Sequence, residues 1–100
     1  MPKEYVIEGA RISSLESFYD EIGSTLIPGA PAWGRNLDAF NDVLRGRFGT
    51  PDEGFTLRWR DAATSKKMLG SVSFDRLVEI IRDHGPGGEQ QEDNVTLLLE

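Results

Sequence analysis

The chain has 100 residues, among them 17 acidic side chains, 11 Lys or Arg, one His and no Cys, and its formal net charge at pH 7 is −6. Without cysteine, the chain cannot form disulfides, thiolate nucleophiles or Cys-based metal sites. The acidic balance opposes nucleic-acid binding, which depends on clustered Lys and Arg, and it favours a cationic partner. The length is that of one domain, so we expect a single domain over residues 1–100.

No segment of the sequence is apolar enough to cross a membrane or to form the core of a signal peptide. The longest apolar runs are the triplets at 5–7 and 97–99, whereas a membrane helix needs about 20 apolar residues. The opening Met-Pro-Lys-Glu leads directly into the first triplet and is interpreted as the start of the folded domain. We therefore expect a cytoplasmic protein that has no membrane partner.

The beginning of the chain has a pattern typical of a strand followed by a helix. The triplet at 5–7 is closed by Glu8-Gly9-Ala10, which suits a short strand that ends in a turn. Ser13 lies three residues before Glu16, a spacing that allows a capping box at the start of a helix. Apolar side chains then recur every three or four residues as far as Leu26, which predicts a helix with one face on the core.

A second helix is predicted after the Pro- and Gly-containing loop at 28–31. Asn36 can cap its first free amides, and Gly46 can stop it after Arg45. The apolar spacing predicts its buried stripe, which comprises Leu37, Phe40, Val43 and Leu44.

The second half of the chain predicts a strand, two more helices and a final strand. Residues 55–60 alternate apolar with polar side chains, as expected for a strand with one covered face. Asp61 can cap a short helix, and Ser71 or Ser73 can cap a longer one. Residues 95–99 are nearly all apolar, which suits a strand buried on both faces, although periodicity alone does not separate such a strand from a short buried helix. This order predicts an α/β fold in which a three-stranded, mostly parallel sheet packs with about four helices through right-handed crossovers.

An enzymatic interpretation has weak support. His84 is the only imidazole, and its place after a predicted helix favours interaction with the negative end of the helix dipole. A Ser-His-Asp triad could be drawn with Ser71 or Ser73, but no Gly-x-Ser-x-Gly turn presents either hydroxyl. The glycines after His84 lack the Lys-Ser/Thr pair of a phosphate loop. Asp38 and Asp42 supply too few oxygens for a metal site. We therefore expect no catalytic residue, metal, cofactor or small-molecule substrate.

The outer face of the second helix is the most informative surface in the sequence. Asp38, Asn41, Asp42 and Arg45 share this face, since they follow one another at spacings of three, one and three residues. One interpretation is a solvated polar face in which Arg45 screens Asp42. The other is an anionic recognition surface with Trp33-Gly34-Arg35 as its aromatic edge. Trp33 is equally consistent with a cover over the core.

The segment that runs from Trp33-Gly34-Arg35-Asn36 through Leu37-Asp38-Ala39-Phe40-Asn41-Asp42 resembles the barstar family, whose members share an aromatic-Gly-x-Asn-Leu-Asp-Ala pattern followed by a second Asp. The strand at 57–60, the pair Ser65-Lys66 and the closing apolar strand match in order and approximate spacing. The resemblance covers nearly everything from 5 to 99. It implies a barstar-like domain over residues 1–100, and an inhibitor rather than an enzyme.

The resemblance also implies a partner and a binding surface. The implied activity is the blocking of the cationic active site of a secreted, guanyl-specific ribonuclease from the same cell, in a 1:1 complex. In the family the second helix and the loop before it do this, and Asp42 matches the Asp that lies where the substrate phosphate would bind. Asp38 matches a second interface Asp of the family. Asp83, on the fourth helix, lies about where the family has an acidic contact residue. The implied partner-binding residues are Asp42, Asp38, Asn41, Trp33, Gly34, Arg35, Asn36, Arg45, Arg47 and Asp83.

The chain departs from the family at three interface positions. Where barstar has aromatic side chains, this sequence has Ala32, Asn41 and Arg47. Arg47 and Arg35 add positive charge beside the two Asp residues, which suggests a partner that carries carboxylates around a basic active site. The alternative function is that of a barstar-fold interaction or antitoxin module whose partner is not a ribonuclease.

Overall fold

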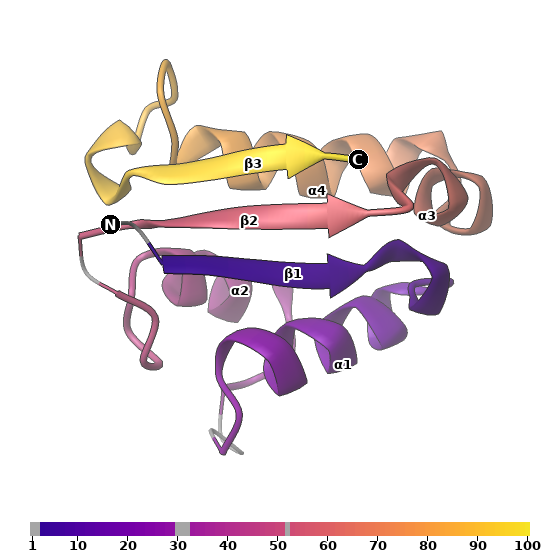
Figure 1. The fold of residues 1–100 in the computed structure, drawn as a ribbon, viewed down its shortest axis with the longest axis horizontal. Helices are drawn as coiled ribbons and strands as arrows, with labels where there is room; N and C mark the ends of the chain where they lie inside the picture. The colour runs from indigo at the N-terminus through magenta and orange to yellow at the C-terminus, as the bar shows by residue number, and fades with distance from the viewer. Residues whose placement is uncertain (1–2, 30–32, 52) are drawn as a thin grey trace.

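The computed structural model describes residues 3–29, 33–51 and 53–100. Its sheet consists of three parallel strands in the order β1-β2-β3, with β2 in the centre. In Figure 1 the helices lie behind the sheet and around its margins, whereas the face of the sheet toward the viewer is open. The predicted α/β fold with a three-stranded parallel sheet and four helices is confirmed. The strands are β1 Lys3–Glu8, β2 Phe55–Arg60 and β3 Val95–Leu99.

Each connection between neighbouring strands contains two α-helices. In Figure 1 both paths pass behind the sheet and advance to the next strand in the right-handed sense. Within the described parts of the chain, no helix has the length and apolar character needed to span a membrane. The α-helices are α1 Leu15–Leu26, α2 Leu37–Leu44, α3 Ala62–Leu69 and α4 Ser71–Asp83, and the short 3-10 helices are η1 Gly9–Arg11 and η2 Gln91–Asp93.

The one-sided cover explains the pattern along the strands. Leu57 and Trp59 of β2 are fully buried against the helices, whereas Arg58 between them lies on the open face. Arg58 donates there to Glu4 at 2.8 Å and to both carboxylate oxygens of Glu100 at 3.1 and 3.0 Å. The expectation of a last strand buried on both faces is wrong, because β3 is an edge strand with one open face and Leu98 is 42% exposed.

The N-terminal caps predicted for the four helices are confirmed only in part. Asn36 caps α2 as predicted, since its Oδ1 accepts from the backbone N–H of Ala39 at 2.8 Å. The capping box of α1 is formed one residue later than predicted, by Ser14 and Ser17. The predicted side-chain caps of α3 and α4 are wrong, because Asp61 makes no capping hydrogen bond and α4 begins with Ser71 itself.

The core is centred on Trp59 of β2. Its ring lies 5.5 Å from that of Phe18 and 5.0 Å from that of Phe74, and Phe18 in turn packs edge-on against Phe40 at 5.1 Å. The indole N–H donates to the Ser65 hydroxyl at 2.9 Å. These contacts hold α1, α2 and α4 against the same strand, and they fix the face that α2 turns to the core.

Candidate partner-binding surface

The inner face of α2 is locked into the core, and this determines which side chains the helix presents to solvent. Phe40, Val43 and Leu44 are buried as predicted. Asp38 is exposed, and Asp42 is half-buried. The two carboxylates therefore lie on the solvent side of a helix whose orientation is set by its apolar stripe.

Asp42 is paired with basic side chains of its own chain. The guanidinium of Arg45 lies 3.0 Å from a carboxylate oxygen of Asp42, and Nε of Arg47 lies 3.8 Å from the same oxygen. Such exposed pairs within a helix contribute only about 0.2 to 0.5 kcal/mol. The two arginines screen the charge of Asp42, but little free energy is lost when another cation replaces them as partners of its carboxylate.

A chain of polar contacts connects α2 to the end of α4. Nε and Nη2 of Arg45 both donate to Oε1 of Gln90, at 2.9 and 2.6 Å. The amide nitrogen of Gln90 donates to Asp83 at 3.0 Å, and the backbone N–H of Glu89 donates to the other oxygen of Asp83 at 3.0 Å. The structure thus brings Asp83 to the same side of the molecule as α2 and uses its carboxylate to hold the loop after α4.

These contacts affect the ionisation of Asp83. The hydrogen bonds from the Gln90 side chain and the Glu89 backbone hold the pKa of Asp83 below its ordinary value. The positive charges of His84 and Arg45 act in the same direction, whereas partial burial opposes them. Asp83 is therefore a stable anion at neutral pH.

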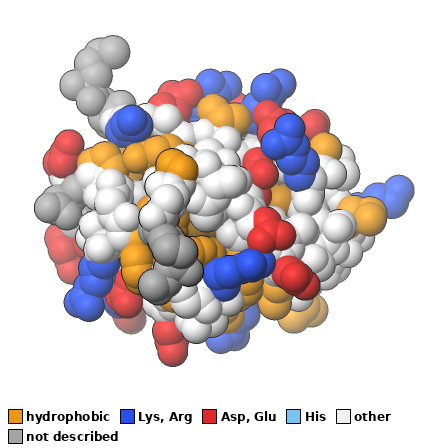
Figure 2. All heavy atoms as spheres, turned by 90° about the horizontal axis from the view of Figure 1, so that it is seen from below, with side chains coloured by type: hydrophobic (Ala, Val, Ile, Leu, Met, Phe, Trp, Pro, Cys, Tyr) orange, Lys and Arg blue, Asp and Glu red, His pale blue; other side chains and the backbone are white. Residues whose placement is uncertain are grey.

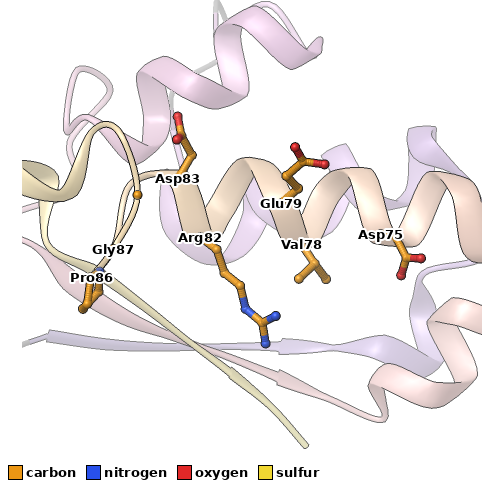
Figure 3. Close-up of a pocket in the computed structure, with 8 residues that line it drawn as sticks. Asp75, Val78, Glu79, Arg82, Asp83, Pro86 and Gly87 are labelled. Atoms are coloured by element: carbon orange, nitrogen blue, oxygen red, sulfur yellow. The ribbon is translucent and has the colours of Figure 1, made fainter.

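The end of α4 lies between two shallow grooves. Figure 3 shows Asp83 and Glu79 projecting from one side of α4, while Val78, Arg82 and Asp75 project from the other. On the Asp83 side, a groove of about 530 Å³ separates α4 from α2, and Arg45 contributes to its wall. The acidic side chain predicted on the fourth helix thus shares a groove with the second helix.

Asn41 is turned inward, although the sequence predicts it on the outer face of α2. Its amide nitrogen donates to the carbonyl oxygen of Leu37 at 3.2 Å, and its Oδ1 lies 2.8 Å from Nε2 of His84. The other ring nitrogen of His84, Nδ1, lies 2.6 Å from Oδ2 of Asp93. The side chain predicted as a partner contact is engaged within the protein.

His84 directly follows the last residue of α4, and its ring makes specific side-chain contacts in addition to its favourable position at the end of the helix dipole. Its side chain is 0% exposed and bridges α2 and η2. Ser73, the nearer of the two hydroxyls considered for a triad, lies roughly 16 Å away along α4 at 1.5 Å per residue. Because this separation prevents a hydrogen bond, a triad with either serine is wrong.

The loop before α2 is held by α1. Trp33 is only 4% exposed and packs edge-on against Tyr19 at 5.7 Å, which makes it a cover over the core. Gly23 allows this approach, because a Cβ at that position would lie 3.1 Å from the indole nitrogen. The guanidinium of Arg35 reaches Asp20 on α1 at 2.5 Å, so it points to α1. Ala32 lies outside the described residues.

Gly34 explains the shape of the turn into α2. Its φ is +91°, and a Cβ there would lie 3.1 Å from the Cβ of Ala39. Arg35, with φ +50°, continues the left-handed turn before Asn36 returns to an extended conformation and caps the helix. The Gly-x-Asn spacing thereby delivers the chain to the first turn of α2, which carries Asp38.

Comparison with known sequences decides the family. The sequence profile of the family described as "Barstar (barnase inhibitor)" matches residues 3–100. The chain belongs to the barstar family. The description names an inhibitor of a ribonuclease, which implies the same broad role for this chain. No curated protein matches the sequence.

Two side chains of this barstar-family chain, Gln90 and Asp93, make contacts near the candidate surface that the sequence did not predict. Gln90 and Asp93 lie in the segment 89–93, where only a polar connector was predicted, yet each makes a contact that reaches α2 directly or through His84. The available signal was a run of Gln, Glu and Asp close to the single histidine. Nothing in that run shows which side chain faces which partner.

On the face formed by α1, this barstar-family chain carries charges of both signs (Figure 2). Seen from the side of α1, acidic and basic side chains lie interspersed (Figure 2). Within residues 3–29, 33–51 and 53–100, no group of three or more His, Cys, Asp or Glu side chains is arranged to hold a metal ion.

Proposed function

We propose that the chain inhibits a secreted, guanyl-specific ribonuclease by placing the outer face of α2 against the basic active site of the enzyme, in a 1:1 complex. The observation that carries the proposal is the family match over residues 3–100. The geometry supports it, because Asp38 and Asp42 lie on the solvent side of a helix that is anchored in the core.

The physical basis is an exchange of ion pairs. A ribonuclease active site gathers Arg, Lys and His to stabilise phosphate charge. Leaving one member of a buried ion pair without its partner costs about 3 to 5 kcal/mol. Within the complex, the Asp42 carboxylate spares the buried cations of the enzyme that cost, whereas Asp42 gives up only the about 0.2 to 0.5 kcal/mol of its pair with Arg45.

The exchange also defines the partner more closely. Once Asp42 faces the enzyme, Arg45 retains only the neutral side chain of Gln90 as an acceptor, and Arg47 loses its nearest carboxylate. A matching enzyme presents carboxylates at the rim of its basic centre. The 69% exposure of the Arg47 side chain supports a contact at this rim.

The remaining proposed contact residues divide by position. Asp83 is proposed to add a second acidic contact across the groove from α2. Gly34, Arg35 and Asn36 shape the loop that leads into the helix. Trp33 supports this loop from beneath, through its packing on α1. Asn41 contributes to the surface through the position it gives to α2.

The proposed setting is the cytoplasm of the cell that makes the ribonuclease, where an immunity-type inhibitor must capture the enzyme before it cleaves cellular RNA. The net charge of −6 favours attraction of a basic enzyme over distance. Such attraction raises the association rate and weakens with added salt.

The test combines inhibition with stoichiometry. The chain is mixed with the secreted guanyl-specific ribonuclease of its own organism, RNA cleavage is followed, and the complex is sized by chromatography with light scattering. We expect full inhibition at one equivalent and a 1:1 complex. A ribonuclease that stays active with an excess of folded chain contradicts the proposal.

The alternative is a barstar-fold antitoxin or interaction module with a partner other than a ribonuclease. One observation favours it: Asp42 is already paired with Arg45 and Arg47, and Asn41 is engaged with His84, so α2 presents less free acidic surface. Copurification of the chain from its native cell separates the two functions. A 1:1 partner without nuclease activity would support the module.

A further inference from the structure

His84 is a fully buried ring with an oxygen atom at each nitrogen. Oδ1 of Asn41 lies 2.8 Å from Nε2, and Oδ2 of Asp93 lies 2.6 Å from Nδ1. Asn41 belongs to α2 and Asp93 to η2, so the ring connects the proposed binding helix to the segment before β3. The function proposed above assigns no task to this connection.

Which ring nitrogen of His84 donates depends on its tautomer, and the partners of the ring restrict the choice. The amide nitrogen of Asn41 donates to the carbonyl of Leu37, so its oxygen faces the ring and must accept from Nε2. The carboxylate of Asp93 accepts from Nδ1. Only a ring that carries a proton on both nitrogens satisfies the two acceptors.

Loss of one proton breaks one of these two hydrogen bonds, and they differ in strength. A bond to a carboxylate is stronger than a bond to an amide oxygen. The neutral ring therefore keeps its proton on Nδ1, facing Asp93, and gives up the bond from Nε2 to Asn41. The hydrogen bond that is lost is therefore the one that connects the ring to α2.

Charged groups lie near the ring on two elements. Asp93 of η2 contacts it directly, and the neighbouring Asp83 is connected to Arg45 through Gln90. From α2 and β3 the direct contacts are the neutral side chain of Asn41 and the backbone of Val95, whose N–H donates to the His84 carbonyl at 2.9 Å.

We propose that His84 is a positioning residue for the binding face of α2, which it holds in place only while both ring nitrogens are protonated. Asn41 lies between Asp38 and Asp42 on α2, so its bond to the ring fixes the part of the helix that carries both carboxylates. The affinity of the chain for its partner then falls as the pH is raised through the titration of this ring. This consequence for affinity rests on the proposed function.

The first test uses the free, unmodified chain. Because the sequence contains one histidine, the nuclear magnetic resonance signals of its ring nitrogens are unambiguous. We expect both nitrogens to be protonated at the acidic end of the titration and Nε2 to lose its proton first. The side-chain amide of Asn41 and the backbone amides of α2 should shift with the same midpoint. A ring that titrates without any change in α2 overturns the inference.

The second test uses two variants that each retain one of the contacts. The amide of His84→Gln reaches toward Asn41 and donates at every pH, whereas that of His84→Asn reaches toward Asp93 only. Affinity for the cognate ribonuclease is measured by calorimetry from the acidic to the alkaline side of the ring's titration. The wild type should lose affinity by about two- to tenfold, the net worth of one hydrogen bond.

The variants then separate a positioning role from a merely structural one. His84→Gln should retain the high affinity throughout, and His84→Asn should show the low affinity throughout, with any titration of the enzyme's own groups common to all three proteins. Equal pH dependence of the wild type and His84→Gln overturns the inference. Should either variant fail to fold, Asp93→Asn tests the same connection from the other side of the ring, because it replaces the carboxylate at Nδ1 with a neutral amide. The pH dependence of its affinity should then differ from that of the wild type, and an identical pH dependence overturns the inference.

The two proposals fail in different ways. If the ribonuclease is not bound at any pH, the proposed function is wrong, while the resonance titration of the free chain still decides whether His84 holds α2. If the ribonuclease is bound tightly and the α2 signals do not follow the ring, the function stands and the role of His84 is refuted.

Discussion

Asp42 of α2 and Arg45, the residue that caps the C-terminal end of this helix, form an ion pair whose closest atoms are 3.0 Å apart, and the same guanidinium holds Gln90 of the loop after α4. The acidic side chain proposed to meet the partner is therefore connected to the loop that follows the fourth helix. A partner that draws Asp42 away from Arg45 changes only a weak contact, because Gln90 continues to position the guanidinium.

Asp42→Ala should weaken binding to the ribonuclease more than any other single substitution on α2. Removal of the carboxylate leaves the buried cations of the enzyme without a partner, and a cost of about 3 kcal/mol or more corresponds to at least about 100-fold in affinity. Calorimetric titration measures the effect, with Asp38→Ala as the matched variant one turn earlier. An unchanged affinity would show that α2 is not the binding element.

Arg47→Ala should change the dissociation rate of the complex by less than about fivefold, because exposed ion pairs contribute about 0 to 1 kcal/mol. The change should shrink further as salt is added. The dissociation rate is measured by surface plasmon resonance at low and moderate salt. A rise beyond about tenfold that does not respond to salt would place Arg47 in a buried contact of the interface.

Phe40→Ala should lower the free energy of unfolding by about 3 to 5 kcal/mol, since the ring is fully buried and packs against Phe18. Urea unfolding followed by circular dichroism measures the loss. Val72→Ala is the control, because Val72 is 84% exposed and its removal should change stability by less than about 0.5 kcal/mol. A loss below about 1 kcal/mol for Phe40→Ala would contradict the orientation of α2.

Asp83→Asn should destabilise the protein at neutral pH, with a difference from the wild type that disappears in acid. The folded state lowers the pKa of Asp83, so the anion contributes stability above the ordinary carboxyl range, near pH 4, and this contribution is lost as the pH falls through the lower native value. Urea midpoints at pH 7 and at successively lower pH test the trend.

Asp75→Asn is the matched control for that experiment. Asp75 lies on the same helix, and its side chain is exposed and 3.8 Å from Lys66. Its removal should change the urea midpoint little at any pH. A difference between Asp83→Asn and the wild type that persists unchanged in acid would show that the charge of Asp83 does not stabilise the loop.

Features that depend on neighbours within a turn or a strand could be predicted from the sequence alone. The alternation over residues 55–60 predicted a strand covered on one face, and the spacing of Phe40, Val43 and Leu44 predicted the buried side of α2. Asn36 was recognisable as a cap because its target, the N–H of Ala39, lies three residues away. Periodicity and capping act locally, so they can be inferred from spacing alone.

Contacts between residues that lie far apart in the sequence could be seen only in the tertiary structure. It placed β3 at an edge of the sheet, which left part of an apolar strand in solvent. It turned Arg35 toward Asp20 and Asn41 toward His84, which is 43 residues away in the sequence. Side chains on one helix face are equivalent by spacing, and only the packing of α2 against α4 and η2 selects the one that turns inward. The partner-binding face therefore follows from the sequence in outline, while the division between outward contacts and internal support depends on the fold.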